Sequence, residues 1–133
     1  MDRIFLDANV LFSAAYRDGS GLVRLWELEN VKLITSAYAA EEATVNLTEE
    51  GQRARLSNLL EKVQIISSLV ALPPAILLPL KDQPILQAAL AAKATHLLTG
   101  DVHHFGILYG RHVGGVLILP PSEYFIQRTS KRG

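Results

Sequence analysis

Short apolar runs alternate with segments of helical periodicity along the whole chain. Runs rich in Ile, Leu and Val predict buried strands at 3–6, 31–35, 63–66, 96–99 and 116–119. The spacing of apolar residues predicts helices at 22–28, 37–48, 56–63, 83–94 and a short one around Tyr124. Strands that alternate with helices in this way are typical of a parallel sheet covered by helices on both faces.

Glycine, proline and small polar residues mark the boundaries of these elements. Ser36 is a natural N-cap for the helix at 37–48, and Glu49-Glu50-Gly51 reads as the end of that helix or a turn. The segment 67–80 contains three prolines, so we expect a connection packed on the core. We expect a loop or broken helix at 103–115.

Length and composition indicate one folded domain over residues 1–133. Hydrophobic residues make up 49% of the chain and charged residues 20%, as in ordinary globular proteins. No apolar run approaches the roughly 18 residues that span a membrane, and the N-terminus has no basic region followed by an apolar one, so we expect a cytoplasmic protein. The absence of cysteine excludes disulfides, thiolate metal sites and a cysteine nucleophile.

Charge gives no overall attraction to nucleic acid, because 13 Lys and Arg balance 13 Asp and Glu. Phosphate binding would have to come from local basic groups or from metal held by acids. Residues 127–133 form a basic C-terminal tail that either touches a partner or is a solvated end. Further candidates for phosphate contacts, or plain surface charges, are Lys81, Arg17 and one of Arg53 or Arg55.

Acidic residues stand where strands end and helices begin. Asp7 and Asp101 follow predicted strands, and Asp82 precedes a helix with Pro84 in its first turn. Ligands of open parallel sheets bind beyond the carboxyl ends of the strands, so these acids could converge there. Two carboxylates ~4 Å apart repel by about 4 kcal/mol at an effective dielectric near 20, which protons or cations must relieve.

Each acid also has an ordinary structural interpretation. Asp7 could cap a helix that begins near Asn9, and Asp82 is the best N-cap in the chain. Glu41 and Glu42 lie about 100° apart around a helix, so they cannot both face one site.

Several polar residues near these acids could support them or contact substrate. Asn9 and Thr99 could hydrogen-bond a carboxylate, although Asn9 could instead be a cap and a strand threonine often only packs. His103 and His104 could supply a metal ligand or a phosphate contact, or merely shape their loop. The candidates of this supporting group are Asn9, Ser36, Thr99, His103 and His104.

Four segments together resemble the PIN-domain nucleases, a family that includes VapC-like toxins. They are Ile4–Asn9, Thr35–Glu42, Lys81–Leu86 and Leu98–Asp101, and the match covers nearly the whole chain. The resemblance implies a three-layer α/β/α sandwich with a five-stranded, mainly parallel sheet. It also implies that Asp7, Glu42, Asp82 and Asp101 hold Mg²⁺ or Mn²⁺, with Glu42 preferred to Glu41. Some relatives carry a further aspartate where this chain has His103 and His104. The resemblance therefore leaves open whether the site binds one metal ion or two.

The resemblance further implies hydrolysis of phosphodiester bonds in single-stranded RNA by a toxin that pairs with an antitoxin and forms a homodimer. The alternatives are a stand-alone RNA-processing nuclease and a catalytically silent PIN-like scaffold. Phosphatase chemistry with Asp7 as nucleophile is a third alternative, and we rank it low because Asn9 stands where that chemistry usually needs a second carboxylate.

Overall fold

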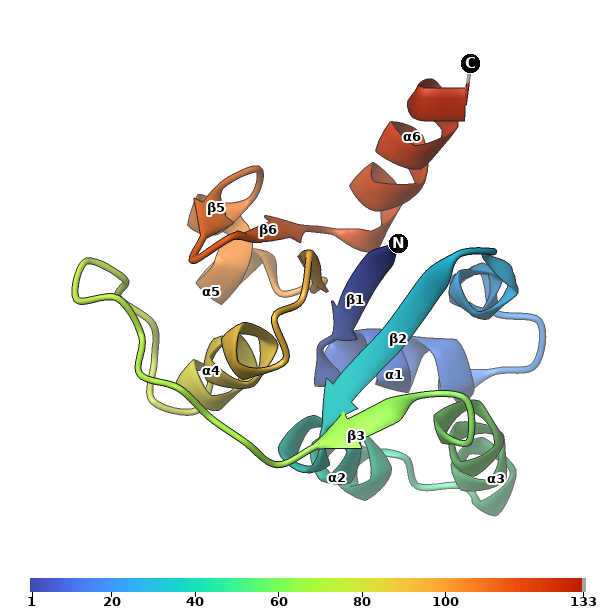
Figure 1. Cartoon of the computed structure of the whole chain (residues 1–133). Helices are drawn as coiled ribbons and strands as arrows, with labels where there is room; N and C mark the ends of the chain where they lie inside the picture. Colours follow the sequence, from blue (N-terminus) through green and yellow to red (C-terminus); the bar gives the residue numbers. More distant parts are fainter. Residues whose placement is uncertain (133) are drawn as a thin grey trace.

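A six-stranded sheet forms the centre of the molecule, and helices cover both of its faces (Figure 1). The computed structural model describes residues 1–132, and the side chains of residues 1–129. The strands are β1 (Asp2–Leu6), β2 (Val31–Ser36), β3 (Gln64–Ile66), β4 (His96–Leu98), β5 (His112–Val113) and β6 (Val116–Leu119). The helices are α1 (Ala8–Tyr16), η1 (Gly21–Glu27), α2 (Ala37–Asn46), α3 (Glu50–Leu60), α4 (Gln83–Ala91), α5 (Val102–Phe105), η2 (Gly106–Leu108) and α6 (Pro121–Arg132).

The strand order β3-β2-β1-β4-β6-β5 reverses direction at β1. The chain first moves outward from β1 through β2 to β3, and it then crosses back to pair β4 with the other edge of β1. Right-handed crossovers therefore place α1, α2 and α3 on one face and α4 on the other. The carboxyl ends of β1 and β4 form the switch point of the sheet, where such folds bind their ligands.

The two central strands are buried on both faces, as parallel strands between helical layers usually are. Ile4, Phe5 and Leu6 of β1 are fully buried, and so are Leu97 and Leu98 of β4. Burial on both faces requires apolar side chains at successive positions, which is why these strands read as continuous hydrophobic runs in the sequence. The first exposed or polar positions after each run therefore fall at the rim of the sheet.

The predicted parallel sheet is confirmed, and the structure adds one strand. The five predicted strands correspond to β1, β2, β3, β4 and β6, which pair in parallel. The additional strand β5 has two residues and pairs antiparallel with β6, within the segment for which we expected a loop or broken helix. So short a strand has no alternating pattern to detect.

Several helices differ from the predictions in their ends or their type. Glu49 does not end a helix but begins one: it forms a capping box with Gln52 at the start of α3. The helix predicted at 22–28 is a 3-10 helix, η1. Helix α4 stops at Ala91 instead of residue 94, and Lys93 adopts a positive φ of 53° just beyond it.

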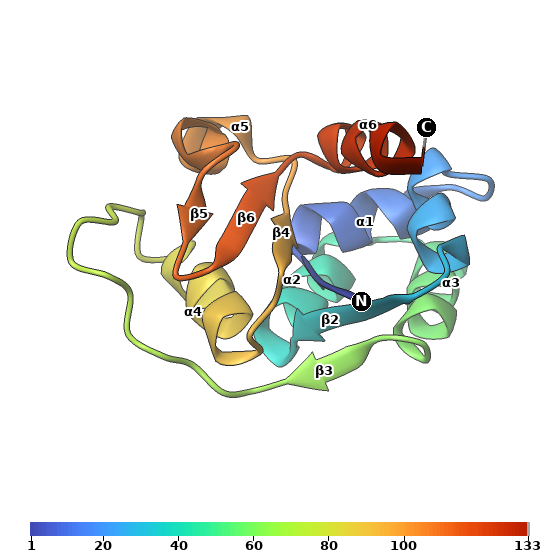
Figure 2. The ribbon, with the colours of Figure 1, turned by 45° about the horizontal axis from the view of Figure 1, so that its top comes forward.

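The segment 67–80 is a connection without helix or strand, as predicted, and it curves away from the sheet between β3 and α4 (Figure 2). The prediction that it packs on the core is wrong for most of its length, because most of its residues are exposed, although Leu78 is buried. The segment predicted as a basic tail is instead the last part of α6 as far as Arg132, and residue 133 lies outside the described residues. Arg128 in this segment donates a hydrogen bond of 2.6 Å to the carbonyl of Glu29, so it is tied to the body of the protein. No helix within residues 1–132 has the length and apolar character needed to cross a membrane.

Candidate active site

The four predicted acids line a single cleft at the switch point of the sheet. Asp7 directly follows β1, Asp101 follows β4, Asp82 precedes α4, and Glu42 lies on α2. The cleft has a volume of about 440 Å³. Its lining residues are Asp7, Ala8, Asn9, Phe12, Glu42, Ala43, Asn46, Lys81, Asp82 and Asp101. The structure therefore brings together carboxylates that are separated by up to 94 positions in the chain.

Asp7 is buried and fully engaged in hydrogen bonds. Its Oδ1 accepts from the N–H of Ala8 at 2.6 Å at the start of α1, and its Oδ2 accepts from the Thr99 hydroxyl at 2.8 Å. The pKa of Asp7 is raised from 3.8 to about 6, mainly by burial and to a smaller extent by the charges of Glu42 and Asp82, whereas the hydrogen bonds from Thr99 and Ala8 lower it. Asp7 is thus both the cap of α1 and a member of the acidic cleft, so the two interpretations are compatible.

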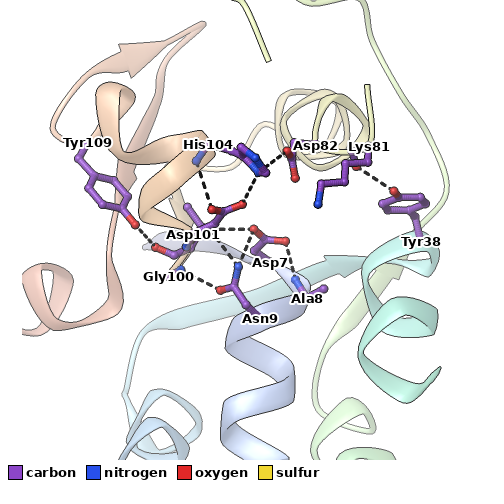
Figure 3. Close-up of polar contacts among 11 residues, drawn as sticks. Asp7, Ala8, Asn9, Tyr38, Lys81, Asp82, Gly100, Asp101, His104 and Tyr109 are labelled. Carbon is purple, nitrogen blue, oxygen red and sulfur yellow. Dashed lines mark hydrogen bonds and ion pairs between the residues drawn. The ribbon is translucent and has the colours of Figure 1, made fainter. Parts of the chain in front are cut away.

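Asn9 and Thr99 connect the end of β1 to the end of β4. The Asn9 side chain donates to Asp7 Oδ2 at 3.2 Å, and its Oδ1 accepts from the N–H of Gly100 at 2.8 Å (Figure 3). The fully buried Thr99 hydroxyl, which donates to Asp7, also accepts from the N–H of Asp101 at 3.1 Å. These bonds fix the distance between the backbone segments that carry Asp7 and Asp101.

Replacing Thr99 with Val should lower the free energy of unfolding by about 1–3 kcal/mol, because Asp7 and the Asp101 N–H lose a buried partner. The distance between Asp7 and Asp101 should also be less well fixed, because the Thr99 hydroxyl bonds both Asp7 and the N–H of Asp101. Urea denaturation measures the loss of stability. Thr35→Val is the matched control, because the equally buried Thr35 hydroxyl bonds only the Leu6 carbonyl at 2.8 Å. A Thr99→Val protein that loses no more stability than Thr35→Val would contradict the prediction.

Asp82 occupies the N-cap position of α4, but its side chain makes no capping hydrogen bond. The sequence prediction of a structural cap is therefore wrong for this carboxylate. The residue is 9% exposed, and its buried Oδ2 has no hydrogen-bond partner among the described residues. Burial raises the pKa of Asp82, His104 lowers it, Asp101 raises it, and Lys81 lowers it.

His104 lies between two of the acids. Its Nδ1 is 2.8 Å from Asp82 Oδ2 and 2.9 Å from Asp101 Oδ2 (Figure 3). The other oxygen of Asp101 accepts from the backbone N–H of His104 at 3.2 Å and so caps α5. The neighbouring His103 is exposed and forms no ion pair with these acids among the described residues, so the structure brings only one of the two predicted histidines to the acids.

Helix α2 brings Glu42 to the cleft. The buried Ser36 hydroxyl accepts from the N–H of Ala39 at 3.0 Å and starts the helix, as predicted for this cap. Glu42 is exposed and lines the cleft, whereas the equally exposed Glu41 does not. Ser36 therefore acts on the site through the position of α2.

Two tyrosines that the sequence analysis missed support the same region. The Tyr38 hydroxyl donates to the carbonyl of Lys81 at 2.8 Å and joins α2 to the segment before Asp82. The Tyr109 hydroxyl donates to the carbonyl of Thr99 at 2.7 Å. Burial raises the pKa of both tyrosines, and nearby acids add to the effect. A single tyrosine in a segment of unknown structure carries no pattern that would reveal such a contact.

These side chains fit a divalent cation. Ligand atoms of Asp82, Asp101 and His104 all lie within 4.8 Å of one another, and the buried Asp82 oxygen without a hydrogen-bond partner is one of the nearby donors. Carboxylate oxygens are the ligands that Mg²⁺ and Mn²⁺ prefer. A cation would also compensate for the burial that makes the ionised form of Asp7 unfavourable.

A second, larger cleft of about 840 Å³ lies between α1, η1 and α3. It is lined by two of the basic side chains that we considered for phosphate contacts, Arg17 and Arg55. Arg55 is occupied with the carbonyls of Ala15 and Tyr16 at 3.0 and 3.1 Å, where it satisfies the C-terminal end of α1. Of the basic candidates, Lys81 is the one that lines the acidic cleft.

Comparisons with known proteins identify the family and the fold. A family model described as PIN domain matches residues 3–103. The fold is similar to that of a chain in the crystal structure of VapBC2 from Rickettsia felis bound to a DNA fragment from their promoter, with a TM-score of 0.64 and 15% sequence identity. That alignment covers 89% of this chain and 98% of the other. Seven chains of solved structures match in all, and no curated protein sequence matches.

Proposed function

The chain belongs to the PIN-domain family, and from this premise we propose that it is a metal-dependent endoribonuclease that cleaves single-stranded RNA, acting as the toxin of a toxin–antitoxin module. The observation that carries the proposal is the convergence of Asp7, Glu42, Asp82 and Asp101 in one cleft. Unpaired carboxylates are costly at such short range, so a site that keeps them together favours the binding of cations.

The acids would hold Mg²⁺ or Mn²⁺, with Asp7, Asp82 and Asp101 at the base of the cleft and Glu42 at its exposed side. A divalent ion bound there supplies the positive charge that activates a water molecule and stabilises charge on a phosphodiester. Serine and cysteine nucleophiles are not needed for this chemistry. The chain's own contribution is to hold carboxylates of high charge density in fixed positions.

The hydrogen bonds around Asp7 serve this positioning. Thr99 and Asn9 both donate to Asp7 Oδ2, so its lone pairs keep a fixed direction while Oδ1 is held by the N–H of Ala8. Lys81 lies on the rim of the same cleft, where an ammonium group attracts a phosphate and opposes the negative field of the acids. In the proposed reaction Lys81 binds substrate and takes no part in proton transfer.

The dimensions of the cleft support a single-stranded substrate. Its volume of about 440 Å³ is in the range of small-ligand sites and accommodates a nucleotide, whereas a duplex presents a much broader surface. The neutral net charge of the chain also argues against a duplex-binding protein that relies on many phosphate contacts. We expect tight binding to need the cation.

The test compares cleavage of a single-stranded RNA, the same RNA as a duplex, and the corresponding DNA strand, each with Mg²⁺, with Mn²⁺ and with EDTA. We expect the single-stranded RNA to be cut fastest, and only when a divalent ion is present. Cleavage that continues in EDTA would contradict the metal requirement. Faster cleavage of DNA or duplex RNA would contradict the proposed substrate.

The proposed antitoxin partner and homodimer follow from the same family. The solved structure with a similar fold is that of VapBC2 bound to promoter DNA. This likeness supports the proposal of a protein partner for the present chain. Copurification of a small protein encoded beside this chain, together with loss of RNA cleavage in the complex, is the expected result. A chain that purifies alone and is not inhibited by its neighbour would instead be a stand-alone nuclease. Light scattering of the purified chain measures whether it is a dimer.

A further inference from the structure

His104 occupies the position between Asp82 and Asp101 that a cation would share with them. We propose that His104 is a direct ligand of the divalent ion, so that the site binds metal through nitrogen as well as oxygen and favours Mn²⁺ over Mg²⁺. This inference rests on the proposed metal-dependent function and adds one ligand to the four acids.

The distances match a coordination shell. Nδ1 of His104 is 2.8 Å from Asp82 Oδ2 and 2.9 Å from Asp101 Oδ2. Neighbouring ligands of an octahedral ion with bonds of about 2.1 Å are separated by about 3.0 Å, which is the bond length multiplied by the square root of two. An ion could therefore bind all three residues after small side-chain adjustments, without a change of the backbone.

A hydrogen bond alone satisfies this arrangement less well. Nδ1 of an imidazole carries one proton at most, and two carboxylate oxygens lie within reach of it. Asp101 Oδ2 forms a hydrogen bond with Nδ1, whereas the buried Asp82 Oδ2 has no hydrogen-bond partner among the described residues in spite of its short distance. One proton cannot point at both oxygens, but one cation binds both.

The histidine is held by the fold. Asp101 Oδ1 accepts from the backbone N–H of His104, so the first turn of α5 orients Asp101 Oδ2 and Nδ1 toward each other. The next residue, Phe105, is fully buried and anchors α5 to the core. A ligand fixed in this way loses little freedom when it binds an ion, which favours affinity.

Nitrogen coordination has a consequence for metal preference. Mg²⁺ prefers oxygen ligands and near-ideal octahedral geometry, whereas imidazole is a good ligand for transition metals. A site built from Asp82, Asp101 and His104 should therefore discriminate in favour of Mn²⁺. A site built from the carboxylates alone has no imidazole to produce this difference.

The experiment is electron paramagnetic resonance of the purified chain loaded with Mn²⁺, with measurement of the echo modulation from directly bound nitrogen. We expect nitrogen coupling in the wild-type protein and its loss in His104→Ala. In equilibrium dialysis, the same substitution should weaken Mn²⁺ binding by at least about tenfold, and Mg²⁺ binding less. His103→Ala is the matched control, because the adjacent His103 is exposed and forms no ion pair with Asp82 or Asp101 among the described residues, and it should behave as the wild type.

The outcomes separate this inference from the proposed function. Mn²⁺ that binds without nitrogen coupling, or coupling that persists in His104→Ala, would overturn the role of His104 and leave metal-dependent cleavage standing. Unchanged or tighter Mn²⁺ binding by His104→Ala would also overturn it, since a histidine that only pairs with the acids competes with the ion. A chain that binds no divalent ion would overturn both proposals. The wild-type spectrum is decisive even if the variant folds poorly.

Discussion

Asp7→Asn should reduce RNA cleavage by at least about 100-fold, because loss of a residue that only supports a metal ligand already costs about 10–100-fold and Asp7 is proposed to bind the ion itself. The substitution keeps the shape of the side chain. Asparagine is also a good N-cap, so α1 can still begin at Ala8. The measurement is the cleavage rate of single-stranded RNA in Mg²⁺ or Mn²⁺, accompanied by a thermal denaturation curve.

Asp18→Asn is the matched control for this substitution. Asp18 is exposed and lines the larger cleft between α1, η1 and α3, away from the acids at the switch point. It loses the same charge, so a general effect of net charge on RNA binding would appear in both variants. Equal cleavage by the wild type, Asp7→Asn and Asp18→Asn would remove Asp7 from the site.

The stability of the wild-type protein without metal should fall as the pH rises from about 4 to about 6, relative to Asp7→Asn. The folded-state pKa of Asp7 is about 6 and its ordinary value is 3.8. Between these values the folded state binds more protons than the unfolded state, so ionisation favours unfolding. A shift of about two units at about 1.4 kcal/mol each corresponds to a loss of stability of about 3 kcal/mol, which is absent below about pH 4 and complete above about pH 6.

Urea denaturation of the two proteins in EDTA, at pH 4.5 and at pH 7, measures this difference. Subtracting the Asp7→Asn values removes the contributions of the other titrating groups. We expect the variant to be at least as stable as the wild type at pH 7, although it is inactive. Parallel pH dependences for the two proteins would show that burial of Asp7 has no such cost.

The positions of the main strands could be predicted because burial on both faces leaves a continuous apolar pattern, and their parallel direction because helices alternate with them. Phe5 and Leu97 are fully buried in the adjacent strands β1 and β4, and the sequence around each is apolar. Strand β5 and the capping box at Glu49 could not be predicted, because both depend on a few local hydrogen bonds that leave no periodic signal. The pattern of apolar residues thus identifies buried helices and strands more reliably than capping residues identify where those elements begin and end.

The candidate site was accessible from the sequence only in part. Asp7 and Asp101 follow strands, and their convergence follows from the rules of parallel sheets. Asp82 was a candidate because of the family resemblance and not because of its local pattern, since a residue at an N-cap usually bonds the backbone, and here the carboxylate does not. The contact of His104 with two acids depends on the first turn of α5, a helix of four residues that no periodicity reveals.

The link between Asp7 and Thr99 has a consequence for the growing protein. Their hydrogen bond spans 92 positions, and Asp101 lies beyond it. Contacts between such distant parts of a chain form late, because the loop between them must close first. A chain still being synthesised therefore carries Asp7, Glu42 and Asp82 without the strand that completes their arrangement. The proposed activity should therefore begin only after β4 has left the ribosome and paired with β1.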